Sequence, residues 1–219
     1  MSGINDSTAA WYASRATGVV ALVLLTAVML LGLLVSRQHR LPGLPRFATS
    51  GLHRNLSLLA TAFVVVHVVT AVLDGYVNIP VTAAVVPLTS PYERFWLALG
   101  AVSLDLMLAA VVTSLLRRHL SRKVWLAVHL TAYLSWPVAW VHSFYASGDL
   151  RQGWLMELAV GCAAAVTLAA GWRVAAAAMD VPRAERVGRL MAAVHHPPNQ
   201  PPGDVPGERA PGRERTLSR

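Results

Sequence analysis

The chain alternates between long apolar runs and short polar connections. The apolar runs cover roughly residues 10–35, 52–73, 95–116, 123–145 and 154–179. Each run exceeds the length of about 20 apolar residues that a helix needs to cross the hydrocarbon core of a bilayer. No run shows the period-two alternation of a membrane β-barrel. The pattern predicts an all-α fold, a polytopic membrane helical bundle with five transmembrane helices.

One further apolar segment does not fit this pattern. Residues 74–94 contain Pro80, Pro87 and Pro91 between apolar residues. Proline lacks a backbone N–H and interrupts a helix, and lipid does not tolerate an irregular backbone with unsatisfied polar groups. We therefore expect a cap over one face of the bundle that dips partly into the membrane. The alternative is a bundle with six crossings, in which this segment spans the bilayer.

The formal net charge of +8 indicates topology rather than nucleic-acid binding, because the basic residues cluster at the ends of the apolar runs. Arg and Lys are frequent after the first and third runs and in the C-terminal region. They are sparse at the N-terminus, in residues 74–94 and around Asp149. Since basic residues favour the cytoplasmic side, we expect a multi-pass protein of the cell membrane, with its N-terminus outside and its C-terminus in the cytoplasm.

These patterns divide the chain into three parts. Residues 1–9 form a short external N-terminus, and residues 10–179 form the transmembrane domain. Residues 180–219 are rich in proline, glycine and charge, and such a segment cannot bury enough apolar surface to fold alone. We therefore expect a disordered cytoplasmic tail. The single cysteine, Cys162, excludes a disulfide or an iron–sulfur site built from this chain alone.

Two of the apolar runs carry a pair of histidines each. His53 and His67 lie fourteen positions apart in the second run, and His129 and His142 lie thirteen positions apart in the fourth. Each pair therefore spans about 20 Å along its helix axis. With the expected topology the two helices run in the same direction, so the histidines match in depth. Imidazole is a standard axial ligand of haem iron, and the pattern favours two b-type haems held one above the other between two helices.

Another interpretation of the buried histidines is a proton relay or a set of hydrogen bonds between helices. Asp105, which we expect to be buried near the middle of the third helix, would belong to such a relay or would hydrogen-bond a neighbouring serine. On this alternative the chain is a transporter or an assembly factor without haem. The remaining histidines are expected in loops or the tail and in neither role; they are His39, His119, His195 and His196.

One geometric difficulty concerns the fourth helix. At about 100° per residue, thirteen positions leave His129 and His142 roughly 140° apart around a straight helix. Pro137 lies between them, and proline usually kinks a helix. We expect a local change of winding or tilt at Pro137 to bring both rings toward their partners.

The two histidine pairs, together with the sequence TSLLRRHLSRKVWLAVHLTAYLSWPVAWVH, resemble the ferric reductase-like transmembrane domain. This superfamily includes ferric reductases, NADPH oxidases and the haem-binding membrane subunit of a bacterial methionine sulfoxide reductase system. The resemblance covers about residues 10–179. It implies a bundle with two b haems that pass electrons across the membrane, with His53 and His129 as inner ligands and His67 and His142 as outer ligands.

The chain also departs from many members of that superfamily. It contains no GxGxxG motif and no strand–helix alternation typical of a domain that binds flavin and NAD(P)H. We therefore expect the electrons to come from a separate cytoplasmic flavoprotein reductase or from a membrane quinol, and to leave to an external acceptor. The resemblance supports electron transfer more firmly than any particular terminal reductase activity.

Further residues are candidates for contacts with the two haems. Haem propionates are anionic and need cationic partners near the membrane faces, although such cations also serve topology alone. Trp136, between His129 and His142, would fill the space between two macrocycles or would pack in the core, and the second role is favoured. The cationic candidates are Arg54, Arg117 and Arg118 for the inner haem and Arg15 for the outer haem.

Overall fold

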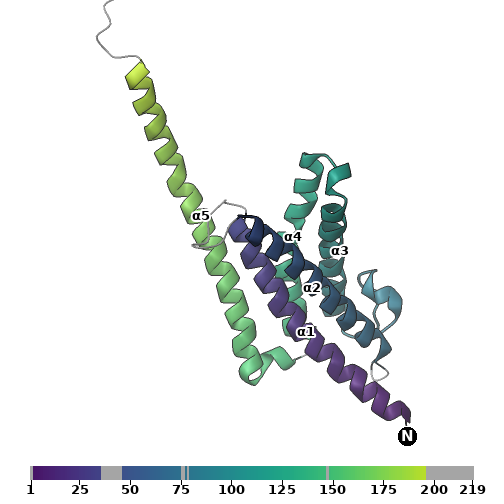
Figure 1. The fold of residues 1–219 in the computed structure, drawn as a ribbon. Coiled ribbons are helices and arrows are strands. Elements are labelled where there is room, and N and C mark those ends of the chain that lie inside the picture. The colour runs from purple at the N-terminus through teal and green to yellow at the C-terminus, as the bar shows by residue number, and fades with distance from the viewer. Residues whose placement is uncertain (1, 36–45, 75–76, 78, 147, 196–219) are drawn as a thin grey trace, which may run out of the picture. The chain divides into compact units, whose positions relative to one another are not determined.

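A computed structural model describes residues 2–35, 46–74, 77, 79–146 and 148–195 of the chain. Within these residues the regular structure is helical throughout (Figure 1). The long helices are α1 (Ser2–Val35), α2 (Arg46–Leu73), α3 (Arg94–Leu115), α4 (Arg122–Ala146) and α5 (Gly153–His195). Three short 3₁₀ helices are η1 (Val81–Ala84), η2 (Arg117–His119) and η3 (Asp149–Arg151).

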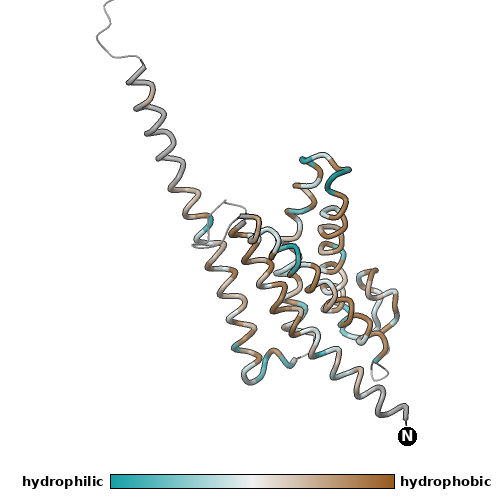
Figure 2. The backbone as a smooth tube through the Cα atoms, viewed as in Figure 1, coloured by the Kyte–Doolittle hydropathy of each residue, from teal (hydrophilic) through white to brown (hydrophobic). Residues whose placement is uncertain are grey.

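Five stretches are long and apolar enough to cross a bilayer. They are Thr8–Leu34, Phe47–Leu73, Arg94–Leu115, Arg122–Ala146 and Gly153–Met179. Figure 2 shows that these helices are largely hydrophobic, with hydrophilic residues concentrated at places such as the η2 turn between α3 and α4. The predicted membrane bundle with five crossings is confirmed.

The first four helices form two hairpins. α1 packs along α2, and α3 packs along α4. Fewer contacts join the hairpins, mainly between α1 and α4, and Figure 1 shows the α1–α2 hairpin inclined to the α3–α4 hairpin. This arrangement leaves space between α2 and α4, the two helices that carry the histidine pairs.

The transmembrane part of α5 completes the core against α1 and α4. One buried cluster contains Leu22, Leu150 and Ala159, and a second contains Trp136, Cys162 and Val166. Many of the other buried positions are alanines, which allow close approach of helix backbones in a membrane. Large apolar side chains such as Leu134 and Leu168 are exposed on the outer faces of the helices, as expected for a surface that meets lipid.

Of the segment between α2 and α3, the structure describes residues 74, 77 and 79–93, and these are irregular apart from η1, as the prolines predict. η1 packs against α3 and buries Ala83, whereas Val81 and Val85 are exposed. The segment therefore forms a cap on one end of the bundle rather than a sixth crossing.

Two helix boundaries differ from the prediction. α1 begins at Ser2 rather than near residue 10, so the short N-terminal segment is mostly helical. α5 continues to His195, although a disordered tail was predicted from residue 180. Residues 183–195 contain Ala, Arg, Glu, Leu and Met, which are good helix formers, and the high proline and glycine content begins only after them. Residues 196–219, with His196, lie outside the described residues, as does His39.

The number of crossings and the basic connections together predict the sidedness of the chain. Reporter fusions after Arg40, Thr89 and Glu208 should report a cytoplasmic, an external and a cytoplasmic location, respectively, because each crossing reverses the side. Paired phosphatase and fluorescent-protein fusions in cells measure this directly. An external signal after Glu208 together with a cytoplasmic signal after Arg40 would require an additional crossing and would contradict the five-helix fold.

Candidate functional site

The structure brings His53 on α2 close to His129 on α4. Their ring centroids lie 6.4 Å apart, with an angle of 73° between the ring planes. The two residues come from different hairpins, and their rings meet edge to face between α2 and α4. This is one of the two pairs expected from the sequence.

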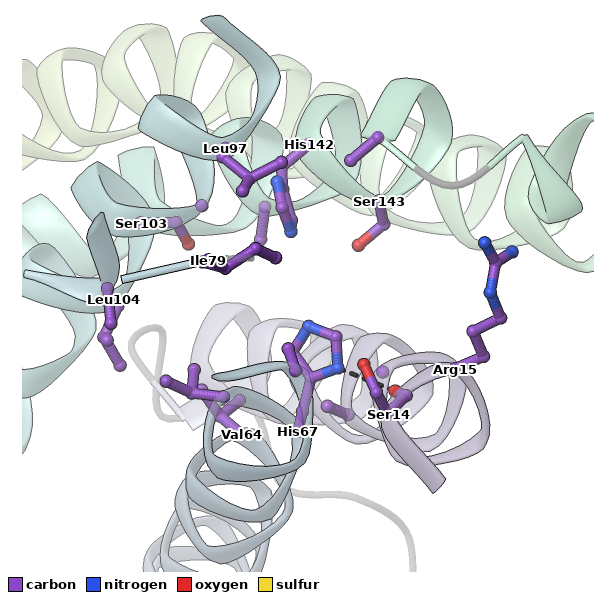
Figure 3. Close-up of a pocket in the computed structure, with 18 of the residues that line it drawn as sticks. Ser14, Arg15, Val64, His67, Ile79, Leu97, Ser103, Leu104, His142 and Ser143 are labelled. Atoms are coloured by element: carbon purple, nitrogen blue, oxygen red, sulfur yellow. Dashed lines mark hydrogen bonds between the residues drawn. The ribbon is translucent and has the colours of Figure 1, made fainter. Parts of the chain in front are cut away.

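His67 and His142 lie at the other level of the bundle. Both line a cavity of ≈ 250 Å³ whose walls come from all of the first four helices and from the segment around η1. Figure 3 shows the two imidazoles directed into this cavity from opposite walls. The other walls are mainly apolar, with Val64, Leu97 and Leu104 among the lining residues. This is the second expected pair.

The rings of His67 and His142 are each held by a backbone carbonyl of the neighbouring helix. Nδ1 of His67 lies 2.7 Å from the carbonyl oxygen of Ser14 on α1, and Nδ1 of His142 lies 2.8 Å from that of Trp96 on α3. A carbonyl oxygen only accepts hydrogen bonds, so Nδ1 donates in both cases. In a neutral imidazole Nε2 then keeps its lone pair. Both rings therefore have a nitrogen lone pair available to a metal.

Glycines on α1 and α3 make room for three of the four imidazoles. A Cβ atom on Gly18 would lie 2.9 Å from Nδ1 of His67, and one on Gly100 would lie 2.7 Å from Cε1 of His142. A Cβ atom on Gly32 would lie 3.4 Å from Cε1 of His53. The first two distances are shorter than any normal contact, so only glycine fits beside His67 and His142 without displacement of the ring.

The positions of these glycines explain how a backbone carbonyl within a helix becomes accessible to an imidazole of the neighbouring helix. Gly18 follows Ser14 by four residues, and Gly100 follows Trp96 by four. A helical side chain covers the turn that precedes it, where the carbonyl four residues earlier lies. Without a side chain at Gly18 or Gly100, the imidazole reaches that carbonyl.

The His53–His129 pair is held differently. Ser114 lies on α3 fourteen residues after Gly100. It stands beside His129 as Gly100 stands beside His142. Its hydroxyl oxygen lies 3.3 Å from Nδ1 of His129 and also accepts a bond from Nε1 of Trp125 at 3.4 Å. Nδ1 of His53 is buried and makes no hydrogen bond within the described residues. The carbonyl of Val28, four residues before Gly32, is its neighbour on α1 but does not reach hydrogen-bond geometry.

The geometry of the histidine pairs fits axial ligation of one metal ion between two rings. A bond between imidazole nitrogen and a transition metal is about 2.0–2.1 Å long, and the ring centroid lies roughly 1 Å behind the nitrogen, so two imidazoles on one metal have centroids about 6 Å apart. The 6.4 Å between the rings of His53 and His129 agrees with this value. Within the described residues no group of three or more His, Cys, Asp or Glu side chains forms a metal site. The remaining ligands would have to come from the cofactor itself.

The four candidate arginines lie in different surroundings. Arg15 lines the cavity of His67 and His142, but its guanidinium is bound to Asp149 and lies 4.2 Å from the ring centroid of Trp11. A propionate at Arg15 would therefore share this cation with a carboxylate. Arg117 lies 4.4 Å from the ring centroid of Trp125. Arg54 and Arg118 are exposed.

Trp136 packs in the core rather than in the cavity of His67 and His142. Its ring is 8 % exposed and lies in the cluster with Cys162 and Val166 of α5. Nε1 of Trp136 donates a hydrogen bond of 3.0 Å to the hydroxyl of Thr26 on α1. This position supports the core-packing interpretation of Trp136.

The expectation for Asp105 is wrong. Asp105 is exposed on α3, not buried. The serines proposed as its partners point elsewhere, since Ser103 donates to the carbonyl of Ser135 and Ser114 contacts His129. The reason is rotational: Ser103 and Asp105 lie about 200° apart around the helix, so the buried face that contains Ser103 excludes Asp105.

α4 remains helical through Pro137. His129 nevertheless meets α2, Trp136 meets α1, and His142 reaches the cavity. Because the two hairpins are inclined (Figure 1), the side of α4 that faces the other hairpin changes along its length. The thirteen-residue spacing is therefore compatible with two pairs.

Sequence reasoning missed the glycines and the carbonyls that position the rings. A signal was present, because Gly18 and Gly32 are fourteen positions apart, as are His53 and His67. In an antiparallel hairpin, equal spacings on the two helices place each glycine beside one histidine. The Arg15–Asp149 ion pair had no comparable signal, since the two residues are 134 positions apart.

Comparison with known proteins identifies one family. The family described as "Ferric reductase like transmembrane component" matches residues 17–140, more than half of the 219-residue chain. The matched region contains His53, His67 and His129 and ends two residues before His142. No curated protein and no solved structure gives a significant match.

The close approach of Gly18 and Gly100 to the rings predicts a selective sensitivity to a methyl group. Gly18→Ala and Gly100→Ala should each destabilise the protein by about 1–3 kcal/mol through overpacking, and should lower the amount of bound haem at the His67–His142 level. Thermal unfolding and haem per protein, measured in detergent, test this.

The matched control for these variants is Gly161→Ala on α5. Nothing lies within 4 Å of a Cβ atom at Gly161, and alanine favours a helix over glycine by up to about 1 kcal/mol. Gly161→Ala should therefore leave stability unchanged or raised. Equal losses at Gly18, Gly100 and Gly161 would contradict a specific role for the ring contacts.

Proposed function

Because the chain belongs to the ferric reductase like transmembrane component family, we propose that it carries electrons across the membrane through two b-type haems, one held by His53 and His129 and the other by His67 and His142. The observation that carries this proposal is the approach of α2 and α4 histidines at two levels, with ring centroids 6.4 Å apart in the His53–His129 pair and a shared cavity for His67 and His142. Family membership by itself supports a membrane electron-transfer function.

The residues of this chain prepare each site for a flat apolar cofactor. A haem supplies a one-electron iron couple when bound. The carbonyls of Ser14 and Trp96 orient the rings of His67 and His142 and hold the proton on Nδ1, so that Nε2 faces the cavity. Apolar side chains such as Val64 and Leu104 exclude water from the walls. The two levels are about 20 Å apart along the helices, so two centres in series are needed for transfer between the two faces.

The proposed direction of electron transfer, and the proposed donor and acceptor, rest on the topology of the chain. With the N-terminus outside, the His53–His129 pair lies near the cytoplasm and the His67–His142 pair lies near the external face. A separate cytoplasmic flavoprotein or a membrane quinol would donate electrons to the haem near the cytoplasm. The acceptor would be external. The identity of this acceptor distinguishes the possible activities within the family.

The alternative function, a haem-free transporter with a proton relay, depended on a buried Asp105. A proton relay needs ionisable groups in sequence along one path, whereas Asp105 is exposed on a face of α3 away from the histidines. Asp105→Asn should therefore leave the haem content and the spectrum unchanged, and a measured loss of haem in this variant would contradict the assignment of Asp105 to a position without a role in the site.

The proposed function is tested by absorption spectroscopy. Purified protein from haem-replete cells should give the b-type bands in a reduced-minus-oxidised spectrum, with about two haems per chain. The absence of these bands would overturn the proposal.

Substitution of single ligands tests which histidine serves which haem. His67→Ala or His142→Ala should remove one spectral component and leave about half of the haem, because each loss removes an axial ligand at one level only. His53→Ala or His129→Ala should remove the other component. Electron transfer to an external acceptor should stop in all four variants.

The control for these variants is His119→Ala, since His119 is exposed in η2. It should keep both components, as should alanine at His39, His195 and His196. The two-level arrangement is wrong if His53→Ala and His67→Ala deplete the same component.

A further inference from the structure

We propose that Ser114 and the Arg117–Trp125 stack make the two haem sites electronically unequal, so that the haem at His53 and His129 has the higher midpoint potential. This inference rests on the proposed binding of two haems and concerns which of them takes up an electron first. It is carried by a difference in what holds the imidazoles, and by a difference in the charge near them.

The first difference lies in the partners of Nδ1. At the His67–His142 level both Nδ1 atoms donate to carbonyl oxygens at 2.7 and 2.8 Å. Such a bond pushes electron density onto Nε2 and makes the imidazole a more basic ligand, which stabilises the oxidised iron and lowers the potential. At the other level the Nδ1 contacts are weaker: the carbonyl of Val28 is the neighbour of His53 on α1 but does not reach hydrogen-bond geometry, and His129 contacts a hydroxyl at 3.3 Å.

Ser114 is the residue responsible for the partner of His129. A glycine at this place would expose the carbonyl of Ala110, four residues earlier, as Gly100 exposes that of Trp96. The Ser114 side chain instead offers its hydroxyl to Nδ1 of His129, and this hydroxyl already accepts from Nε1 of Trp125. Ser114 therefore acts as a positioning residue that withholds the stronger acceptor.

The second difference is a positive charge. The ring of Trp125 stacks on that of His129, with centroids 5.0 Å apart and an angle of 19°, and the Arg117 guanidinium lies 4.4 Å from the centroid of Trp125. A cation near the His129 ligand favours the reduced iron, which carries one positive charge less. At the other level the cation of Arg15 is bound to Asp149, so its charge is balanced. Both differences raise the potential at His53 and His129 relative to the other site.

The test is a spectroelectrochemical redox titration of the purified full-length protein, with components assigned by the His53→Ala and His67→Ala variants. In the wild type, the component that His53→Ala removes should have the higher midpoint. Ser114→Gly should lower the midpoint of that component and leave the other unchanged, because the carbonyl of Ala110 becomes available to His129. Ala109→Gly is the matched control: it places a glycine at an exposed position of the same helix and should shift neither midpoint.

A second variant keeps the test decisive if glycine at position 114 impairs folding. Arg117→Gln should also lower the midpoint of the His53–His129 component alone, whereas Lys123→Gln, the same charge change at an exposed position of α4, should not. Equal midpoints, an inverted order, or no selective shift in Ser114→Gly and Arg117→Gln would overturn this inference while two bound haems still supported the proposed function. Protein without b-type bands would overturn both.

Discussion

A polar imidazole inside a bilayer needs a partner for its ring nitrogens, because lipid offers none. Much of this structure follows from how that need is met. His67 and His142 each give one nitrogen to a backbone carbonyl of the adjacent helix, so the second nitrogen is directed to the cavity. Each carbonyl thus satisfies one ring nitrogen of a buried imidazole and fixes the orientation of the ring.

This arrangement explains why the bundle is built from two hairpins. In each hairpin one helix supplies the imidazoles and the other supplies the small residues beside them, with a backbone carbonyl as partner for His67 and His142. α1 serves α2 through Gly18 and Gly32, and α3 serves α4 through Gly100 and Ser114. The close packing is therefore within the hairpins, and few contacts join one hairpin to the other. α5 has a separate role, because it packs with α1 and α4 and makes the core in which Trp136 and Cys162 are buried.

The same construction can be varied at one position without loss of the fold. A glycine, with no side chain, leaves the carbonyl below it accessible, whereas a serine covers that carbonyl and offers a hydroxyl in its place. The ring remains positioned in both cases, but the strength of the hydrogen bond differs. In this way the two histidine pairs acquire different chemical surroundings, and the residues that make the difference lie on α1 and α3, which carry none of the four histidines.

The amino-acid sequence by itself determined the five crossings and the depth at which each histidine lies. Both depend on local quantities, namely the length of an apolar run and the rise per residue of a helix. The irregular cap after α2 followed in the same way from its prolines. Only the tertiary structure decided which face of each helix is buried and which residues meet across the hairpins. Asp105 is exposed, Arg15 pairs with Asp149, and Ser114 rather than a glycine contacts His129. These outcomes depend on the rotation of each helix and on the register between helices, and periodicity along a single apolar helix leaves both undetermined when nearly every face is hydrophobic.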